Sequence, residues 1–160
     1  MTLAWSTQSR AAGQCRDRQS DDQQRDDTLR VLVVEDHAED AQALRAMLER
    51  WKCNVQVCRS GSQALGGIAE FLPHIAVISL DLPDMRGCDV AHRVYASGGS
   101  HCLLLISLST RDQESERRRA NALGFDFHLI KPVDADEFHR AMTQMAHDYG
   151  LPLAAAMLAE

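Results

Sequence analysis

Five short apolar runs alternate with five segments of helical character, and this alternation most constrains the fold. The runs lie at 29–34, 54–58, 74–79, 102–107 and 127–130, and the helical segments at 38–51, 60–71, 89–96, 112–123 and 134–147. Continuous β-branched runs are typical of strands that are buried on both faces of a parallel sheet. We therefore expect an α/β domain over residues 29–149, with helices on both faces of a doubly wound, five-stranded parallel sheet and right-handed crossovers.

Composition narrows the class of protein. The chain has 160 residues, 45% of them hydrophobic, and a formal net charge of −6. Its densest basic run, 117–119, lies beside Glu114 and Glu116, so we expect no nucleic-acid partner, which would need a basic surface. Five cysteines without CxxC spacing fit a reducing compartment. Because we find neither a signal-peptide pattern nor an apolar stretch of spanning length, we expect a cytoplasmic protein with no membrane partner.

Two flanking segments differ from the alternating region. Residues 1–28 are polar, charged and aperiodic, which predicts a disordered tail or linker. Residues 150–160 form a short, apolar and helix-favouring C-terminal extension. The extension is compatible with an extra turn, the start of a linker or an association segment.

Polar residues stand at the ends of four of the five expected strands. They are Glu35 and Asp36, Ser79, Ser107 and Lys131. Each has an ordinary explanation by itself, since acidic residues suit a helix N-terminus and a hydroxyl can simply end a strand. In a parallel α/β sheet, however, the carboxyl ends of the strands form the usual site. The conjunction of acids, hydroxyls and an ammonium therefore predicts a functional site at this edge.

These motifs resemble the receiver domain of two-component response regulators, over residues 29–149. The resemblance rests on "VLVVED" for the acidic pair, "LPDMRG" for the turn, "LLLIS" for the hydroxyl and "IKP" for the lysine. It implies a flavodoxin-like (βα)5 fold with strand order 2-1-3-4-5. It also implies a signalling module, not an enzyme, that accepts a phosphoryl group from a phosphohistidine on an aspartate.

The resemblance assigns a role to each candidate residue. Glu35 and Asp36 would hold Mg²⁺, together with the backbone carbonyl of Asp81. Ser107 and Lys131 would contact phosphoryl oxygens. Ser107 and His128 would occupy the two switch positions, although the family usually has Tyr or Phe where His128 stands, and a small residue where Leu108 stands.

The sequence departs from the family at the phosphoacceptor. Counting four residues back from Pro83, or eight back from Gly87, reaches Ser79 and not an aspartate. An aspartate is ionised near neutral pH, with a reference pKa of about 3.9, whereas a serine needs a general base. Asp81 lies on the same strand face, but using it as a substitute would require a two-residue slip of the strand.

Three functions follow from these observations. The first is a degenerate receiver that binds Mg²⁺ weakly and acts through protein contacts. The second is an active phosphoryl acceptor that uses Ser79 or Asp81, and the third is a flavodoxin-like binder of a small ligand. Expected partners are a histidine kinase, a phosphotransfer protein or another signalling protein, with a possible homodimer through residues 112–149. With Ser79 uncharged, we expect Lys131 to lie near Asp36 or the Ser79 hydroxyl.

Overall fold

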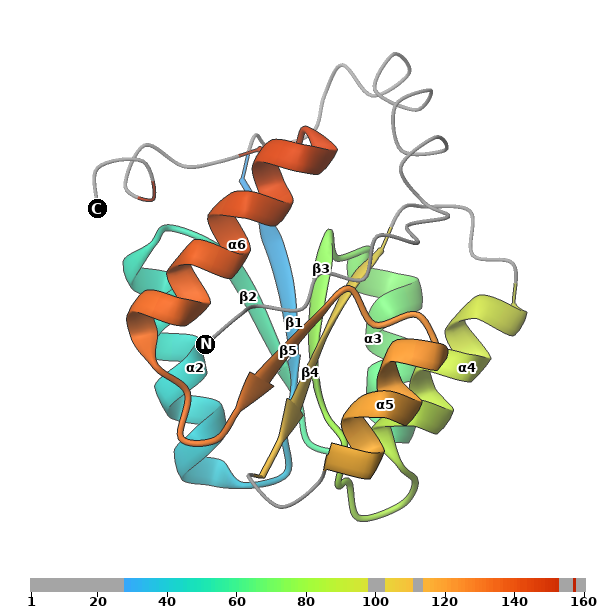
Figure 1. Cartoon of the computed structure of the whole chain (residues 1–160). Coiled ribbons are helices and arrows are strands. Elements are labelled where there is room, and N and C mark those ends of the chain that lie inside the picture. Colours follow the sequence, from blue (N-terminus) through green and yellow to red (C-terminus); the bar gives the residue numbers. More distant parts are fainter. Residues whose placement is uncertain (1–27, 98–102, 111–113, 153–156, 158–160) are drawn as a thin grey trace.

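A five-stranded parallel sheet forms the centre of the domain (Figure 1). The computed structural model describes residues 28–97, 103–110, 114–152 and 157, so the tail expected at 1–28 lies outside the described residues except for Thr28. The strands are β1 (Arg30–Val34), β2 (Asn54–Cys58), β3 (Ile75–Ser79), β4 (Leu104–Ser109) and β5 (Phe127–Ile130). Their order, β2-β1-β3-β4-β5, confirms the expected topology.

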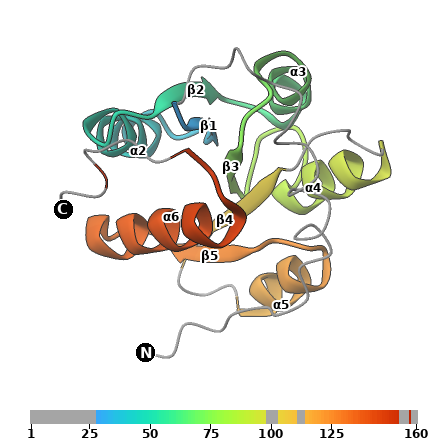
Figure 2. The ribbon, with the colours of Figure 1, turned by 90° about the horizontal axis from the view of Figure 1, so that it is seen from above.

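Helices cover both faces of this sheet (Figure 2). They are α2 (Ala38–Arg50), α3 (Gly61–Phe71), α4 (Gly87–Ala96), α5 (Glu114–Ala122) and α6 (Ala135–Tyr149). Apolar residues of α2 and α6 pack on one face, and those of α3 and α4 pack on the other. Residues of the three central strands, β1, β3 and β4, alternate between the two cores, so these strands are buried on both sides, whereas the edge strands β2 and β5 are only partly buried.

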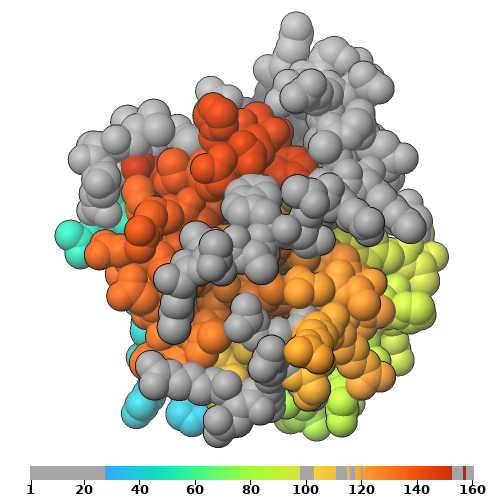
Figure 3. All heavy atoms as spheres, viewed as in Figure 1, coloured from blue at the N-terminus to red at the C-terminus, as the bar shows by residue number. Residues whose placement is uncertain are grey.

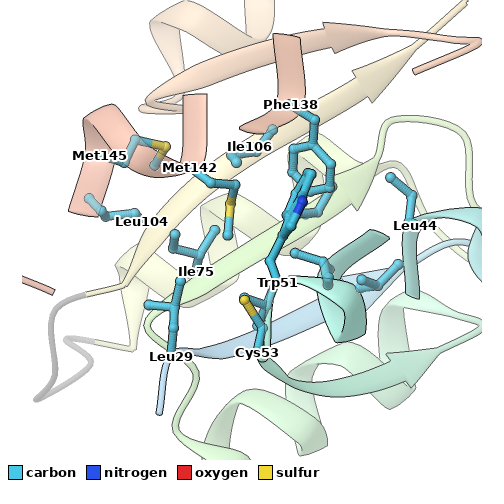
Figure 4. Packing of buried hydrophobic residues seen from close by; sticks show 14 of the residues in the cluster. Leu29, Leu44, Trp51, Cys53, Ile75, Leu104, Ile106, Phe138, Met142 and Met145 are labelled. Carbon is cyan, nitrogen blue, oxygen red and sulfur yellow. The ribbon is translucent and has the colours of Figure 1, made fainter. Parts of the chain in front are cut away.

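The core under α2 and α6 is built around Trp51 (Figure 4). Its indole ring meets Phe138 of α6 edge-on, with 5.4 Å between ring centroids. Met142 and Met145 continue this contact along α6. The outer side of α6 faces the viewer in Figure 3, beside the orange surface of α5. Edge-on aromatic pairs are favourable, and flexible methionines fill irregular gaps in such a layer.

Several element boundaries differ from the sequence prediction by one or two residues, and two of these differences lie at the edge of the sheet that carries the polar residues. Strand β4 runs two residues beyond Ser107, because Leu108 and Ser109 continue to pair with β5. Helix α4 begins at Gly87 and not at residue 89, because Arg86 acts as N-cap and its backbone N–H donates to Asp89 Oδ2 (3.3 Å). The predicted N-cap Asp134 is confirmed by its acceptance of the Glu137 N–H (2.9 Å).

The described cysteines behave as small core residues. Cys53, Cys58 and Cys88 are buried thiols, whereas Cys15 and Cys102 lie outside the described residues. Burial raises the pKa of the Cys53 thiol to about 11, which keeps it protonated and unreactive. Among the residues that the structure describes, none of the helices is both long and apolar enough to span a bilayer.

Candidate functional site

The carboxyl ends of β1 and β5 are joined by an ion pair. Glu35 is fully buried, and its Oε2 lies 2.5 Å from Lys131 Nζ. Its other oxygen accepts the backbone N–H of His37 at 3.1 Å. The same ammonium lies 3.6 Å from Asp40 Oδ2 in the first turn of α2. A buried carboxylate needs such partners, because desolvation without them would cost several kcal/mol.

Asp36 and Glu35 are adjacent in sequence but have different environments. Asp36 is exposed, and its carbonyl oxygen accepts from Arg59 Nη2 (2.6 Å) and Nε (3.2 Å). Lys131 pairs with Glu35 and Asp40, so our expectation that it would lie near Asp36 or the Ser79 hydroxyl was wrong. Asp40 was missed because its approach to Lys131 depends on where α2 begins, which the acidic motif alone does not fix.

Ser79 is the last residue of β3 and is only 1% exposed. Its hydroxyl donates to the carbonyl oxygen of Asp81 at 3.3 Å. Gly87 lies against the backbone here, because a Cβ at residue 87 would be only 2.3 Å from the Ser79 carbonyl oxygen. The Gly87 N–H also donates to the Leu80 carbonyl at 3.0 Å. The proline–glycine turn therefore holds the start of α4 directly on the predicted phosphoacceptor position.

A carboxylate in the same turn is anchored to a neighbouring helix. Asp84 Oδ1 accepts the Gly61 N–H (2.8 Å), and its Oδ2 accepts both the N–H (2.9 Å) and the hydroxyl (2.8 Å) of Ser62. These hydrogen bonds lower the pKa of Asp84 to about 2. Its charge therefore caps the first turn of α3 and fixes the turn that follows β3.

The hydroxyls of β4 have different surroundings. Ser107 Oγ is hydrogen-bonded to His128 Nδ1, and His128 Nε2 donates to Asn121 Oδ1 at 2.5 Å. Ser109, at the end of the strand, is 3% exposed, and its Oγ has no hydrogen-bond partner among the described residues. The N–H of Lys131 donates to the Ser109 carbonyl at 2.8 Å. Sequence reasoning placed the strand-end hydroxyl at Ser107, whereas Ser109 occupies the end of β4 beside Lys131.

Comparison with known proteins defines the class. Residues 31–143 match the model of the response regulator receiver domain, so the chain belongs to this family. It is similar to the transcriptional regulatory protein KdpE of Mycobacterium tuberculosis, at 35% identity over 68% of this chain and 46% of that protein. It is also similar to the virulence sensor protein BvgS of Bordetella bronchiseptica, at 29% identity over 78% of this chain and 10% of that protein. The chain thus spans from about a tenth to about half of these relatives.

Solved structures agree on the fold. A signal receiver domain of a modulated diguanylate cyclase from Desulfovibrio desulfuricans is 28% identical, with a TM-score of 0.68 over 77% of this chain and 97% of that chain. A CheY-like receiver domain protein from Methanospirillum hungatei is 18% identical, with a TM-score of 0.70 over 77% of this chain and 97% of that chain. The second likeness bears on the fold alone.

The described side chains do not form a ready site for a divalent cation, although receiver domains generally bind Mg²⁺ at the acidic pocket. Both oxygens of Glu35 are engaged, one by Lys131 and one by the His37 N–H. Within the described ranges, no group of three or more His, Cys, Asp or Glu side chains is placed to hold a metal ion. Mg²⁺ prefers several oxygen ligands in a near-octahedral arrangement, which this pairing does not offer.

Proposed function

We propose that this receiver domain is degenerate: it acts in two-component signalling through protein contacts, without forming an aspartyl phosphate. The observation that carries the proposal is the buried Ser79 at the end of β3, where the family has its phosphoacceptor. An acyl phosphate needs a carboxylate at this position, and a serine would give only a stable phosphate ester.

The surroundings of Ser79 do not activate it as a nucleophile. Its hydroxyl donates to the backbone carbonyl oxygen of Asp81. A carbonyl oxygen is not a general base, so it cannot take the proton from the serine during nucleophilic attack. The buried carboxylate of the pocket, Glu35, is already paired with Lys131. Asp81 is exposed and lies beyond the strand end, two residues past the phosphoacceptor position. Ser79 therefore lacks a general base, and Asp81 lies away from the position of the phosphoacceptor.

Lys131 supplies positive charge to the acidic pocket without a metal ion. Its ammonium neutralises Glu35 and approaches Asp40, which reduces the demand for a bound divalent cation. We therefore propose that Mg²⁺ binds more weakly than in a receiver with an aspartate at residue 79. If a phosphoryl group were bound, we propose that Ser109, beside Lys131 at the end of β4, would contact it in place of Ser107, whose hydroxyl is bonded to His128.

Partners follow from the family and from the signalling role. We propose a protein partner, such as a histidine kinase, a phosphotransfer protein or another cytoplasmic signalling protein, and no catalytic activity of the domain itself. The surface of α5, β5 and α6, within residues 112–149, is the proposed surface for such a partner or for a second copy. Residues 112 and 113 lie outside the described part.

Incubation with acetyl phosphate and Mg²⁺, followed by intact mass measurement, tests the proposal. We expect the unmodified mass for the natural sequence. A gain of one phosphate would favour the alternative, an active phosphoryl acceptor. Ser79→Ala and Asp81→Asn variants would then identify the residue, because only the variant that removes the acceptor would abolish the gain.

A further inference from the structure

Helix α5 is polar along its whole length. Its nine residues, Glu114–Ala122, read ESERRRANA and include no apolar side chain larger than alanine. Each α5 side chain that the structure describes is exposed, Asn121 included. An isolated helix shorter than about 12 residues is marginal in water, and most helices gain their stability from an apolar face packed on a core. The attachment of α5 to the domain therefore needs another explanation.

A chain of hydrogen bonds through the ring of His128 joins α5 to the sheet. Ser107 of β4 and His128 of β5 are partners in the strand register, and the buried Ser107 hydroxyl is hydrogen-bonded to His128 Nδ1. On the other side of the ring, Nε2 donates to Asn121 Oδ1 of α5 at 2.5 Å. An amide oxygen only accepts, so the neutral imidazole carries its hydrogen on Nε2 and accepts the serine hydroxyl at Nδ1. Both ring nitrogens are thereby used, and the ring connects β4 to the helix.

An imidazole suits this place because it has a polar atom on each side of the ring. Phenylalanine has none and tyrosine has a single hydroxyl, so neither could bond to Ser107 and Asn121 at the same time. The ring of His128 is also tilted toward the buried Phe125, with 6.3 Å between ring centroids. Phe125 and the partly buried Leu123 belong to the core under α3 and α4. Apolar contacts thus anchor the chain directly after α5, and the hydrogen bond of Asn121 holds the helix itself, beside the edge strand β5 (Figure 2).

We infer that α5 is a detachable helix whose hold on the sheet is set by His128. When the hydrogen bond between His128 and Asn121 is lost, the helix has no large apolar side chain to keep it in place, so it opens locally while the sheet stays folded. The inference goes beyond the proposed function, because it concerns the protein alone and does not depend on whether residue 79 accepts phosphate. If α5 also belongs to the partner surface, as the proposed function has it, the partner binds a helix that can move by itself.

Hydrogen–deuterium exchange of the full chain, measured by mass spectrometry on peptides from α5 and β3, tests the inference. We expect Asn121→Ala to speed the exchange of the α5 amides about fivefold, the change that loss of one hydrogen bond produces, and to leave the β3 amides at the parent rate. Alanine is a better helix former than asparagine, so faster exchange in this variant cannot come from a lower helix propensity. Ser115→Ala, at an exposed position of the same helix, is the matched control and should not speed exchange.

His128→Phe provides the second variant. It keeps an aromatic ring beside Phe125 but removes both hydrogen bonds, so the α5 amides should again exchange at least about fivefold faster. The rate in α5 relative to that in β3 separates a loosened helix from a domain that is less stable as a whole. The inference is overturned if Asn121→Ala exchanges its α5 amides no faster than Ser115→Ala. It is also overturned if α5 and β3 speed up equally in Asn121→Ala, because the helix would then open only together with the sheet.

Discussion

Replacing Ser79 by aspartate should convert the pocket into one that needs a metal ion. The new carboxylate would stand at a position that is 1% exposed, at the same strand edge as Glu35. Two carboxylates about 4 Å apart repel each other by about 4 kcal/mol at an effective dielectric constant near 20. Lys131 is already paired with Glu35 and Asp40, so it can offset only part of this repulsion.

We expect the metal-free Ser79→Asp protein to lose about 2 kcal/mol of its free energy of unfolding. For a chain of this size that loss lowers the melting temperature by about 4–8 °C. Mg²⁺ should restore the loss, because it neutralises both carboxylates, and should bind at least about tenfold more tightly than to the natural sequence, a difference of about 1.4 kcal/mol. Acetyl phosphate should then add one phosphate to the variant.

Thermal melts with and without Mg²⁺, calorimetric titration and intact mass give the three readings. Ser79→Asn is the matched control, since asparagine has nearly the volume of aspartate but adds no charge, so it should show neither tighter Mg²⁺ binding nor a gain in mass. If Ser79→Asp binds Mg²⁺ no better than Ser79→Asn and acquires no phosphate, residue 79 is not at the phosphoacceptor position and the proposed function loses its basis.

Three further predictions follow from the geometry. Gly87→Ala should lower the free energy of unfolding by about 1–3 kcal/mol in chemical denaturation, because its Cβ would meet the Ser79 carbonyl at 2.3 Å. The pKa of Asp84 is lowered to about 2, so its ionised carboxylate stabilises the fold fully above the unfolded pKa near 3.8, and this stabilisation is lost as the pH falls toward 2. Asp84→Asn should therefore reduce the loss of unfolding free energy between about pH 4 and pH 2. Burial raises the pKa of Asp126 to about 6, so its contribution should make the protein more stable as pH falls from about 6 to about 4, and Asp126→Asn should remove that rise in urea titrations.

The strands were predictable because short, largely apolar runs alternate with helical segments, whereas their order was implied by the resemblance to receiver domains. The end of β4 was not, because Ser107 looks like a terminal polar residue. In the structure its hydroxyl is hydrogen-bonded to His128, so this polar residue lies inside a buried strand without the free-energy cost of an unpaired hydroxyl. Ser109, two residues further, then occupies the place that the sequence assigned to Ser107.

The residues of the pocket were predictable in type but not in pairing. The positions of Glu35 and Lys131 at strand ends follow from the alternation of strands and helices. The approach of Asp40 to Lys131 depends on the first turn of α2, and the hydrogen bonds of Asp84 depend on where α3 begins. Such contacts join segments that are distant in sequence through loops, whose geometry no periodicity encodes.

Helix α2 has one end at the acidic pocket and the other at the core around Trp51. Asp40, in its first turn, approaches Lys131, and Trp51, directly after its last residue, packs edge-on against Phe138. A helix of 13 residues is about 20 Å long and behaves as a stiff rod. Leu44 and Leu48, between those two ends, are buried in the core, so we expect removal of the Asp40 carboxylate to leave the packing of Trp51 unchanged.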